Sequence, residues 1–540
     1  MTTDSCRIGF ARKRLWTAFV STASLCALCA VAGCADNSSY HPLAMHSPGP
    51  EALARTAQDA QTANGAWPQA QWFESFHDKQ LDALIAEACA GNPDIQAVGA
   101  RLAEAQSQLD QFASGTGLTG GVAAAAYKAR MPAINGAADV NVAGTTVPIN
   151  LFSDPWVSPA SVIAGANYDL DLWGRNRAVT QELVSARDAA HVEEQQARLI
   201  ITTSLVTLYG RLADEYAKRD LVAAKRQQAD QLDEIRRTRE ARGIDSTYAA
   251  QQARIEQATL RMQLQTTDDA ITQTQLQIGV LTGEGPERGL ALRRPTLANA
   301  DAATISVPAN LPFDLLGRRP DVVAAKLRVQ AATAKIAATR AAFYPNINLS
   351  AAGGVASLSL GSLFSSASLF FALGPAVSLP VFERSRLRSQ LHGDYAQADE
   401  MIALYNKTLD GALAEVAHSI ATMRNVTALI DAQTQIAAAR DRMLTVATER
   451  QRRGLVQQAD VLALRDMRLD DQLRLLELNG QRRDARIALI RALGGGFDAT
   501  ASSPSAASPA SRANQGSHEN ISDSRRDRRS SFLPSSSQAS

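Results

Sequence analysis

Few residues in this sequence have both the types and the spacing that an active site requires. The segment GTGLTG at 115–120 has the G-x-G-x-x-G spacing of a dinucleotide-binding loop. That loop must follow a strand and open a helix, whereas here a helical pattern leads into a strand pattern, so we reject it. The seven histidines lack the HExxH spacing of a zinc site, and no P-loop or nucleophile elbow occurs. The sequence therefore predicts no enzyme, no cofactor and no metal site.

Cys34 is the residue for which the sequence predicts a covalent modification. Four basic residues between positions 7 and 14 precede an apolar run that ends at Gly33, which is the form of a secretory signal. The run ends in VAGC (31–34), which resembles a bacterial lipobox, where the cysteine becomes the lipidated first residue of the mature protein. The alternative is an uncleaved membrane anchor, which the serines and threonines in the run disfavour.

Composition and charge narrow the class of protein further. The 540 residues carry a formal net charge of +1, which gives no indication of nucleic-acid binding. Aromatic residues make up only 5%, and alanine is abundant in the helical patterns, so we expect helices that pack closely through small side chains. Removal of the signal would leave Cys89 as the only unmodified thiol, which excludes a disulfide framework within one chain.

The elements that must position any functional residue change abruptly at Gly174. In VIAGANYDLDLW (162–173), apolar and polar residues alternate with the period of a two-faced strand. From Gly174 to Arg242, apolar residues recur at intervals of three and four, which is helical spacing. About 68 helical residues at ~1.5 Å each make a rod of roughly 100 Å, far longer than a compact domain needs.

A shift of roughly 210 residues maps one half of the chain onto the other and predicts an internal duplication. LWGRNR (172–177) is echoed by VFERSR (381–386), and EARGID (240–245) by QRRGLV (451–456). Each half has the pattern of a helix, two strands, a long helix, a glycine-marked turn and a shorter helix. Asn92-Pro93-Asp94 should break or kink the first predicted helix in its early part. The predicted strands are 118–127, 162–172, 347–355 and 371–381.

Four strands with a lipid-like face cannot close a barrel alone. Closure usually takes about eight strands or more, and open strand edges are not tolerated in hydrocarbon. Several copies must therefore share one barrel. Two copies would supply eight strands and three would supply twelve, and this arithmetic does not choose between them.

The segment GRRPDVVAAKLRVQAATAKIAATRAAFYPNINLSAAGG (317–354) resembles the signature region of outer-membrane efflux factors, the TolC-like and OprM-like, NodT-type lipoprotein channels. Further matches at 72–105, 168–177, 379–387 and 452–466 follow in the family's order. The resemblance implies a mainly α fold with a membrane β-barrel: a homotrimer with twelve strands in the outer membrane above a long α-helical periplasmic tunnel. The implied partners are a periplasmic adaptor (membrane fusion) protein, an inner-membrane pump and outer-membrane lipid. The subgroup linked to fusaric acid and drug export is similar to this chain.

The implied function is an outer-membrane channel that passively conducts drugs or toxic small molecules from the pump and adaptor to the outside of a Gram-negative cell. The alternative is a periplasmic structural or adhesive lipoprotein made of coiled-coil rods. The two strand insertions favour the channel, because a scaffold has no need of lipid-matched alternation. The predicted domains are a signal peptide (1–33), a lipid-tethered arm (34–72), a first efflux repeat (73–283), a linker (284–318), a second efflux repeat (319–496) and a disordered serine-rich tail (497–540).

In this fold the alternating strand has one face toward lipid and one toward a wet lumen. Asn167, Asp169 and Asp171 would face the lumen, and Trp173 would sit near the membrane interface. Taken alone, the strand could also cover the core of a soluble sheet. The lipid-facing residues would be Val162, Ala164, Ala166, Tyr168, Leu170 and Leu172.

Two glycines follow the long helices, where a glycine can adopt the left-handed conformation that ends a helix. Two ordinary helix caps would account for them. By resemblance, these turns form the periplasmic tip that contacts the adaptor. The contact candidates are Arg242, Gly243, Ile244, Arg453, Gly454 and Leu455.

Charged residues near these turns are candidates for a gate. A ring of carboxylates at a narrow mouth repels itself unless it is paired or cation-bound, so it can bias opening. The candidates are Asp245 in the first turn and Asp460, Arg465 and Asp466 after the second; an ordinary solvated helix face is the alternative. OprM-like channels place a gate aspartate where this chain has Ala463 and an arginine where it has Asp466, which leaves the gate chemistry open.

Overall fold

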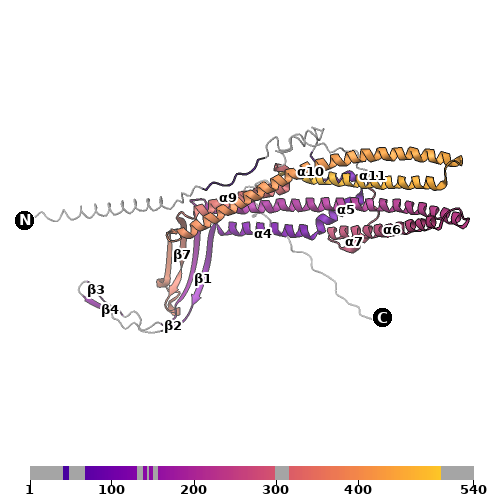
Figure 1. Cartoon of the computed structure of the whole chain (residues 1–540). Coiled ribbons are helices and arrows are strands. Elements are labelled where there is room, and N and C mark those ends of the chain that lie inside the picture. The colour runs from indigo at the N-terminus through magenta and orange to yellow at the C-terminus, as the bar shows by residue number, and fades with distance from the viewer. Residues whose placement is uncertain are drawn as a thin grey trace, which may run out of the picture. The chain divides into compact units, whose positions relative to one another are not determined.

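The structure is a computed structural model that describes residues 40–47, 67–130, 138–142, 145–149, 156–297 and 316–499 (Figure 1). Up to Asp498 these residues belong to one compact unit. The predicted signal peptide at 1–33, the lipidation of Cys34 and the tail beyond Ala499 lie outside the described residues.

The helical segment that precedes β1 (Leu118–Ala126) is divided in two at the predicted position. Helix α3 (Lys79–Gly91) and helix α4 (Pro93–Gly115) meet at Asn92. The Asn92 side-chain oxygen accepts hydrogen bonds from the N–H groups of Asp94 (2.8 Å) and Ile95 (3.2 Å). Pro93 takes the first helical position, where its missing N–H costs nothing. The NPD sequence thus ends one helix and caps the next.

The two long predicted helices are present. Helix α5 runs over Arg175–Ala241 (67 residues) and helix α10 over Arg384–Arg452 (69 residues). Each returns through a shorter helix, α6 (Thr247–Thr282) after α5 and α11 (Gln458–Ala492) after α10. At ~1.5 Å per residue each long helix extends about 100 Å. We call α5–α6 hairpin 1 and α10–α11 hairpin 2.

Strands from both halves of the chain form one antiparallel sheet. Its order is β1 (Leu118–Ala126), β6 (Ala160–Asp169), β7 (Asn346–Ser357) and β8 (Leu369–Ser378), so the pair β6–β7 joins the halves. Figure 1 shows this sheet at the opposite end of the helices from the turns of the hairpins. Two short ribbons between β1 and β6 were not predicted: β2 (Ala129–Arg130) pairs with β5 (Trp156–Val157), and β3 (Ala138–Val142) with β4 (Thr145–Ile149).

The boundaries of the strands differ from the prediction at the helix ends. Strand β6 stops at Asp169 rather than Leu172, and β8 stops at Ser378 rather than Val381. In the first case the reason is Asp171, which has a left-handed backbone with φ 44°. A residue in that conformation cannot continue a strand. The alternation of residues 170–172 therefore belongs to a turn.

The helices pack through two kinds of contact. The largest apolar core joins α3, α5 and α6 around Leu84, Leu205, Tyr209 and Ile278, all fully buried. Helix α9 (Pro320–Ala341) packs against α5 and α10 with five buried alanines beside Val322, Val329 and Ile336. Small side chains allow such close approach, as the alanine content predicts. Helix α7 (Pro286–Leu290) closes the end of α6.

Residues 40–47 lie along the surface of α10. The Tyr40 ring stacks on Tyr395 with 4.0 Å between ring centroids, and its hydroxyl donates to Asp399 Oδ1 at 2.7 Å. Further along, the His46 N–H donates to Asn406 Oδ1 at 2.7 Å. These contacts hold this part of the predicted arm on α10. Within the described ranges, none of the helices has an apolar stretch that could span a membrane.

Candidate functional site

The register of the sheet places most of its large apolar side chains on one face. Directly paired residues of antiparallel strands point to the same side. Leu118 pairs with Tyr168, Tyr168 with Leu349, and Val122 with Ala164. The exposed members of this face are Leu118 74%, Val122 73%, Tyr168 44%, Leu349 43%, Leu369 70%, Phe371 86%, Leu373 69% and Val377 64%. A sheet face with so many exposed large apolar side chains is stable only where it contacts other apolar groups instead of water.

The opposite face of the sheet carries mainly small and polar side chains, with Ile163 and Phe370 as its large apolar residues. Asn167 pairs with Thr119 on one side and with Ser350 on the other, and Asp169 pairs with Asn348. The Ser350 hydroxyl donates to Asn167 Oδ1 at 2.9 Å. The predicted lumen residues Asn167 and Asp169 thus share a polar face, opposite the apolar one.

Asp171 is not a strand residue, so the prediction that placed it with Asn167 and Asp169 is wrong. Its carboxylate accepts hydrogen bonds from the N–H groups of Asn176 (2.8 Å) and Arg177 (3.2 Å). These are two of the four donors that the start of a helix leaves without partners. Asp171 therefore caps α5, and its negative charge complements the positive end of the helix dipole.

Trp173 connects the sheet to the helices. Its ring stacks on Tyr344 with 4.8 Å between centroids, and its indole N–H donates to the Pro345 carbonyl at 2.7 Å. Tyr344 and Pro345 join α9 to β7, so Trp173 fixes the first strand-to-helix connection against the second half of the chain.

Both hairpins end in the same backbone motif. We call residues 242–246 tip 1 and residues 453–457 tip 2. In tip 1, Gly243 N–H donates to the Glu240 carbonyl and Ile244 N–H to the Arg239 carbonyl, both at 2.8 Å. In tip 2 the corresponding bonds from Gly454 and Leu455 are 2.8 and 2.9 Å. This pair of bonds is the Schellman motif. It requires the positive φ found at Gly243 (73°) and Gly454 (74°).

The tips expose apolar side chains to solvent. In a Schellman motif the residue after the glycine often packs back on the helix. In tip 1 that residue is Ile244, which is 59% exposed, and in tip 2 it is Leu455, which is 70% exposed. Arg242 and Arg453, which precede the glycines, are exposed as well. Each tip therefore presents a basic and an apolar side chain together.

Asp245 holds tip 1 together from within. Its Oδ2 accepts from Arg239 Nε at 2.9 Å and from Arg236 Nη1 at 3.1 Å, and the side chain is only 10% exposed. The hydrogen bond from Arg239 holds the pKa of the Asp245 carboxyl below its usual value. Arg236 and Arg239, the two donors to this carboxylate, lie in the same hairpin as Asp245. Asp245 therefore stabilises the turn, and we call it the clamp of tip 1.

The three gate candidates after tip 2 lie in different surroundings. Asp460, in the first turn of α11, and Arg465 are exposed. Asp466 shares Lys225 of α5 with Asp470: Lys225 Nζ lies 3.4 Å from Asp466 and 2.6 Å from Asp470. Burial raises the pKa of the Asp466 carboxyl; Lys225 opposes this and Asp470 adds to it. Asp466 therefore belongs to an ion-pair link between α5 and α11.

A second link between the hairpins was not predicted. Arg483 of α11 donates through both terminal nitrogens to the carboxylate of Asp214 on α5, one bond being 3.0 Å. A Cβ on Gly210 would lie 2.3 Å from Arg483 Nε, and one on Gly480 would lie 2.6 Å from Asp214 Oδ2. Glycines in mid-helix are costly, so their occurrence on two facing helices is the sequence signal for this close contact.

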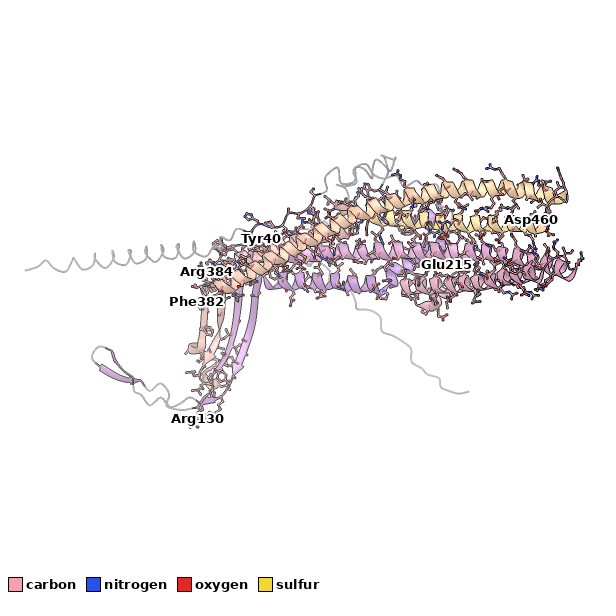
Figure 2. All side chains as sticks on the ribbon, viewed as in Figure 1. Tyr40, Arg130, Glu215, Phe382, Arg384 and Asp460 are labelled. Carbon is pink, nitrogen blue, oxygen red and sulfur yellow. The ribbon has the colours of Figure 1, made fainter. Side chains whose placement is uncertain are left out.

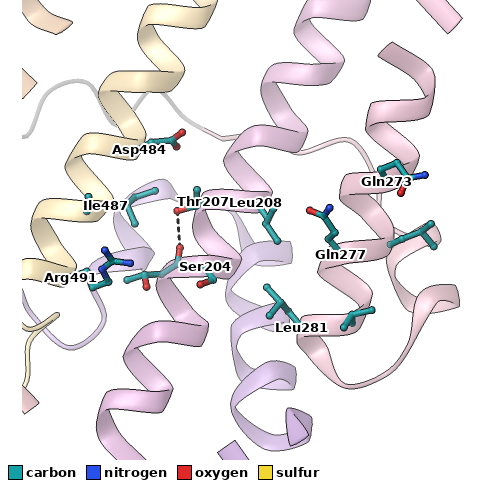
Figure 3. Close-up of a pocket in the computed structure, with 13 residues that line it drawn as sticks. Ser204, Thr207, Leu208, Gln273, Gln277, Leu281, Asp484, Ile487 and Arg491 are labelled. Carbon is teal, nitrogen blue, oxygen red and sulfur yellow. Dashed lines mark hydrogen bonds between the residues drawn. The ribbon is translucent and has the colours of Figure 1, made fainter. Parts of the chain in front are cut away.

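A groove of about 780 Å³ lies between hairpin 1 and α11 (Figure 3). Ser204 and Thr207 of α5, Gln277 of α6, and Asp484 and Ile487 of α11 line it. It holds no arrangement of nucleophile, base and oxyanion donors. Among the described residues no three His, Cys, Asp or Glu side chains gather as a metal would require.

These features define a class of protein: a long helical body that ends in a sheet with one apolar and one polar face is the architecture of an outer-membrane channel subunit. The chain belongs to the outer membrane efflux protein family, whose sequence profile matches residues 84–284 and 311–495. The predicted family, the outer-membrane location and the mainly α fold with barrel strands are confirmed, whereas the trimer and the internal duplication stay predictions.

Individual relatives agree with this assignment. The multidrug resistance outer membrane protein MdtP of Escherichia coli (strain K12) is 28% identical over 445 residues, which cover 82% of this chain and 90% of that protein. The fusaric acid resistance protein FusA of Burkholderia cepacia is 31% identical over 371 residues, 67% of this chain and 66% of that protein. The structure is similar to that of the outer membrane protein VceC from Vibrio cholerae, with 32% identity and a TM-score of 0.71, covering 80% of this chain and 100% of that one.

Proposed function

We propose that three copies of this chain form one channel through the outer membrane, continued by an α-helical tunnel in the periplasm. The observation that carries this is the sheet, whose end strands β1 and β8 each pair on one side only among the described residues. Its apolar face is exposed, and unpaired strand edges in hydrocarbon cost several kcal/mol per group. Pairing of β8 with β1 of another copy satisfies both edges, and three copies give about twelve strands.

The transported molecules are drugs or toxic small molecules, which an inner-membrane pump loads and the channel conducts passively. Two relatives are named for multidrug resistance and for fusaric acid resistance, which supports this class of cargo. Asn167 and Asp169 would line the upper lumen, because they share the polar face of the sheet. No step in this mechanism needs a catalytic group.

The periplasmic adaptor would bind at the tips. Ile244 and Leu455 offer apolar anchors, and Arg242 and Arg453 offer charge beside them. Anchors of this kind dominate protein interfaces when they become buried. Ile244→Asp together with Leu455→Asp should abolish co-purification with the adaptor. Met262→Asp, at a similarly exposed site on α6, is the matched control. Equal loss with the control would remove the tips from the interface.

The gate would use the link between Lys225 and its two carboxylates. Opening of a tunnel requires hairpin 2 to move away from hairpin 1 near the tips, and Lys225 joins them through Asp466 and Asp470. Asp460, exposed at the start of α11, would face its copies around the mouth. Asp460→Ala with Asp466→Ala should raise single-channel conductance in planar bilayers. Arg219→Ala, which breaks a pair inside hairpin 1, should leave the conductance unchanged.

The overall proposal is tested by fractionation and electrophoresis of the full-length protein. We expect it in the outer-membrane fraction as a heat-modifiable trimer, with conductance in bilayers and with loss of drug resistance when the protein is removed from its host. Cys34→Ser should remove an acyl chain detected by mass spectrometry. A detergent-free, soluble, non-conducting rod would instead establish a periplasmic structural lipoprotein.

A further inference from the structure

The connection from β8 to α10 pairs exposed apolar side chains with basic ones. Val381 and Phe382 are 55% and 99% exposed. Arg384 begins α10, and Arg388 follows one turn later, both exposed. Figure 2 shows Phe382 and Arg384 close together where the helices meet the sheet. We call these four residues the junction patch.

The junction patch lies at the edge of the apolar surface of the sheet. The exposed apolar residues of β8 end at Val377, and the first arginine follows at position 384. Since that apolar face needs hydrocarbon around it, the hydrocarbon ends between these two positions. Aromatic side chains favour this boundary, and basic side chains favour the headgroup layer beyond it. The order of residues along the patch matches that sequence of layers.

The first strand-to-helix connection also has an aromatic residue, but the fold uses it internally. Trp173 stacks on Tyr344 and donates to a carbonyl. Phe382, by contrast, is left uncovered by the described part of the chain. The aromatic residue of the second connection is therefore available to an external apolar partner.

The N-terminal arm indicates which side of α10 faces outward. Arg388 and Asp399 are 11 residues apart, about three helical turns, so they lie on one side of α10. On that side Tyr40 binds Asp399, and Leu43 N–H donates to the same carboxylate at 3.0 Å. Tyr40 follows the lipid-bearing residue that we propose, Cys34, by six positions. A segment tethered to the membrane from outside must run along the outer wall, so Arg388 is on that wall.

We propose that the junction patch binds the phosphate groups of anionic phospholipids in the periplasmic leaflet of the outer membrane. Guanidinium groups match phosphate oxygens with paired hydrogen bonds. The Phe382 ring would insert beside the acyl chains while Arg384 and Arg388 contact the phosphate. A basic residue near an anionic surface contributes about 1 kcal/mol, so two give roughly a tenfold to thirtyfold preference over a zwitterionic lipid.

Native mass spectrometry of the full-length protein in neutral detergent tests this proposal. The protein is titrated with phosphatidylglycerol or with phosphatidylcholine of the same acyl chains, and retained lipids are counted. We expect more phosphatidylglycerol than phosphatidylcholine on the wild-type protein. Arg384→Gln with Arg388→Gln should reduce retained phosphatidylglycerol about tenfold and leave phosphatidylcholine unchanged.

The matched control is Arg254→Gln with Arg261→Gln, which removes the same charge from exposed positions on α6. This control should retain phosphatidylglycerol like the wild type. Equal loss in both variants, or no lipid preference in the wild type, would overturn the proposal. Dissociation of the junction variant into single chains would assign the arginines to a contact between copies instead. The same spectra give the oligomeric mass, so a failure of the proposed trimer is seen separately.

Discussion

Tip 1 and tip 2 have the same backbone but are stabilised differently. Both end a helix of nearly 70 residues with a glycine in the left-handed region and the same two hydrogen bonds. Tip 1 adds Asp245, which binds two arginines, whereas tip 2 has Val456 at the corresponding position. The motif that turns the chain is thus separate from the contacts that make the turn rigid. Tip 2 is the one that can rearrange without breaking an ion pair of its own.

The Asp214–Arg483 pair joins hairpin 1 to hairpin 2, and breaking it should have the largest effect on the stability of the protein. Asp214→Ala removes the carboxylate that accepts hydrogen bonds from Arg483, which is only 17% exposed, and leaves it Asp484 at 3.8 Å from its Nε. Because Asp214 is 28% exposed and Asp484 remains nearby, the cost should lie between about 1 kcal/mol for an exposed pair and about 3 kcal/mol for a buried one. Thermal unfolding followed by circular dichroism should show a clear fall in Tm. Asp268→Ala, at an exposed pair with Arg219, should have little effect. Equal shifts would mean that the link between α5 and α11 is not a principal contact.

Substitution of the tip glycines tests what the two tips share. Gly243→Ala and Gly454→Ala should each cost about 1 to 2 kcal/mol, because a Cβ is disfavoured at φ values of 73° and 74°. No atom lies within 4 Å of either added Cβ, so the cost is conformational in both. Amide hydrogen exchange should rise by a similar factor in the two turns. Asn variants, which tolerate this conformation better, should show smaller changes. A large effect at one tip alone would contradict the shared motif.

Substitution of Asp245 tests the contact that tip 1 has and tip 2 lacks. Asp245→Asn should speed amide exchange several-fold in tip 1 and leave tip 2 unchanged, because only tip 1 loses hydrogen bonds to a carboxylate. Val456→Ala is the control. The reverse experiment places a clamp in tip 2: Ala447→Arg with Val456→Asp reproduces the positions of Arg236 and Asp245. Its exchange should slow, and unchanged exchange would show that the clamp depends on other features of hairpin 1.

Acidification should give the smallest difference in amide exchange between the two tips, and it should affect tip 1 alone. The bond from Arg239 lowers the pKa of Asp245 in the folded turn, so its stabilisation is complete above the usual carboxyl pKa of about 4. It is lost as the pH falls through the lower, folded value. Exchange in tip 1, corrected for its intrinsic pH dependence, should therefore increase only in strong acid. Tip 2 and the Asp245→Asn protein should show no such transition; a transition at tip 2 would argue against the clamp as its cause.

Local patterns in the sequence determined the lengths of the helices and the positions of the turns. A helix depends on contacts three and four residues apart, so its periodicity can be read along the chain, and the glycines at 243 and 454 mark where it must stop. The break at Asn92 and Pro93 follows for the same reason. The alternation of apolar and polar residues predicted the four main strands, although the predicted end of β6 was three residues too late.

Tertiary structure decided which distant residues meet. The pairing of β6 with β7 sets Asn167 opposite Ser350, and only this register shows that the large apolar residues of the four strands, except Ile163 and Phe370, lie on one face. Asp171 became a helix cap because the folded turn brings unpaired N–H groups to its carboxylate. Arg483 and Asp214 are 269 positions apart, and no local period relates them. The free energy of such a contact depends on the rest of the fold holding both partners in place. A pattern within one segment of sequence contains no information about that.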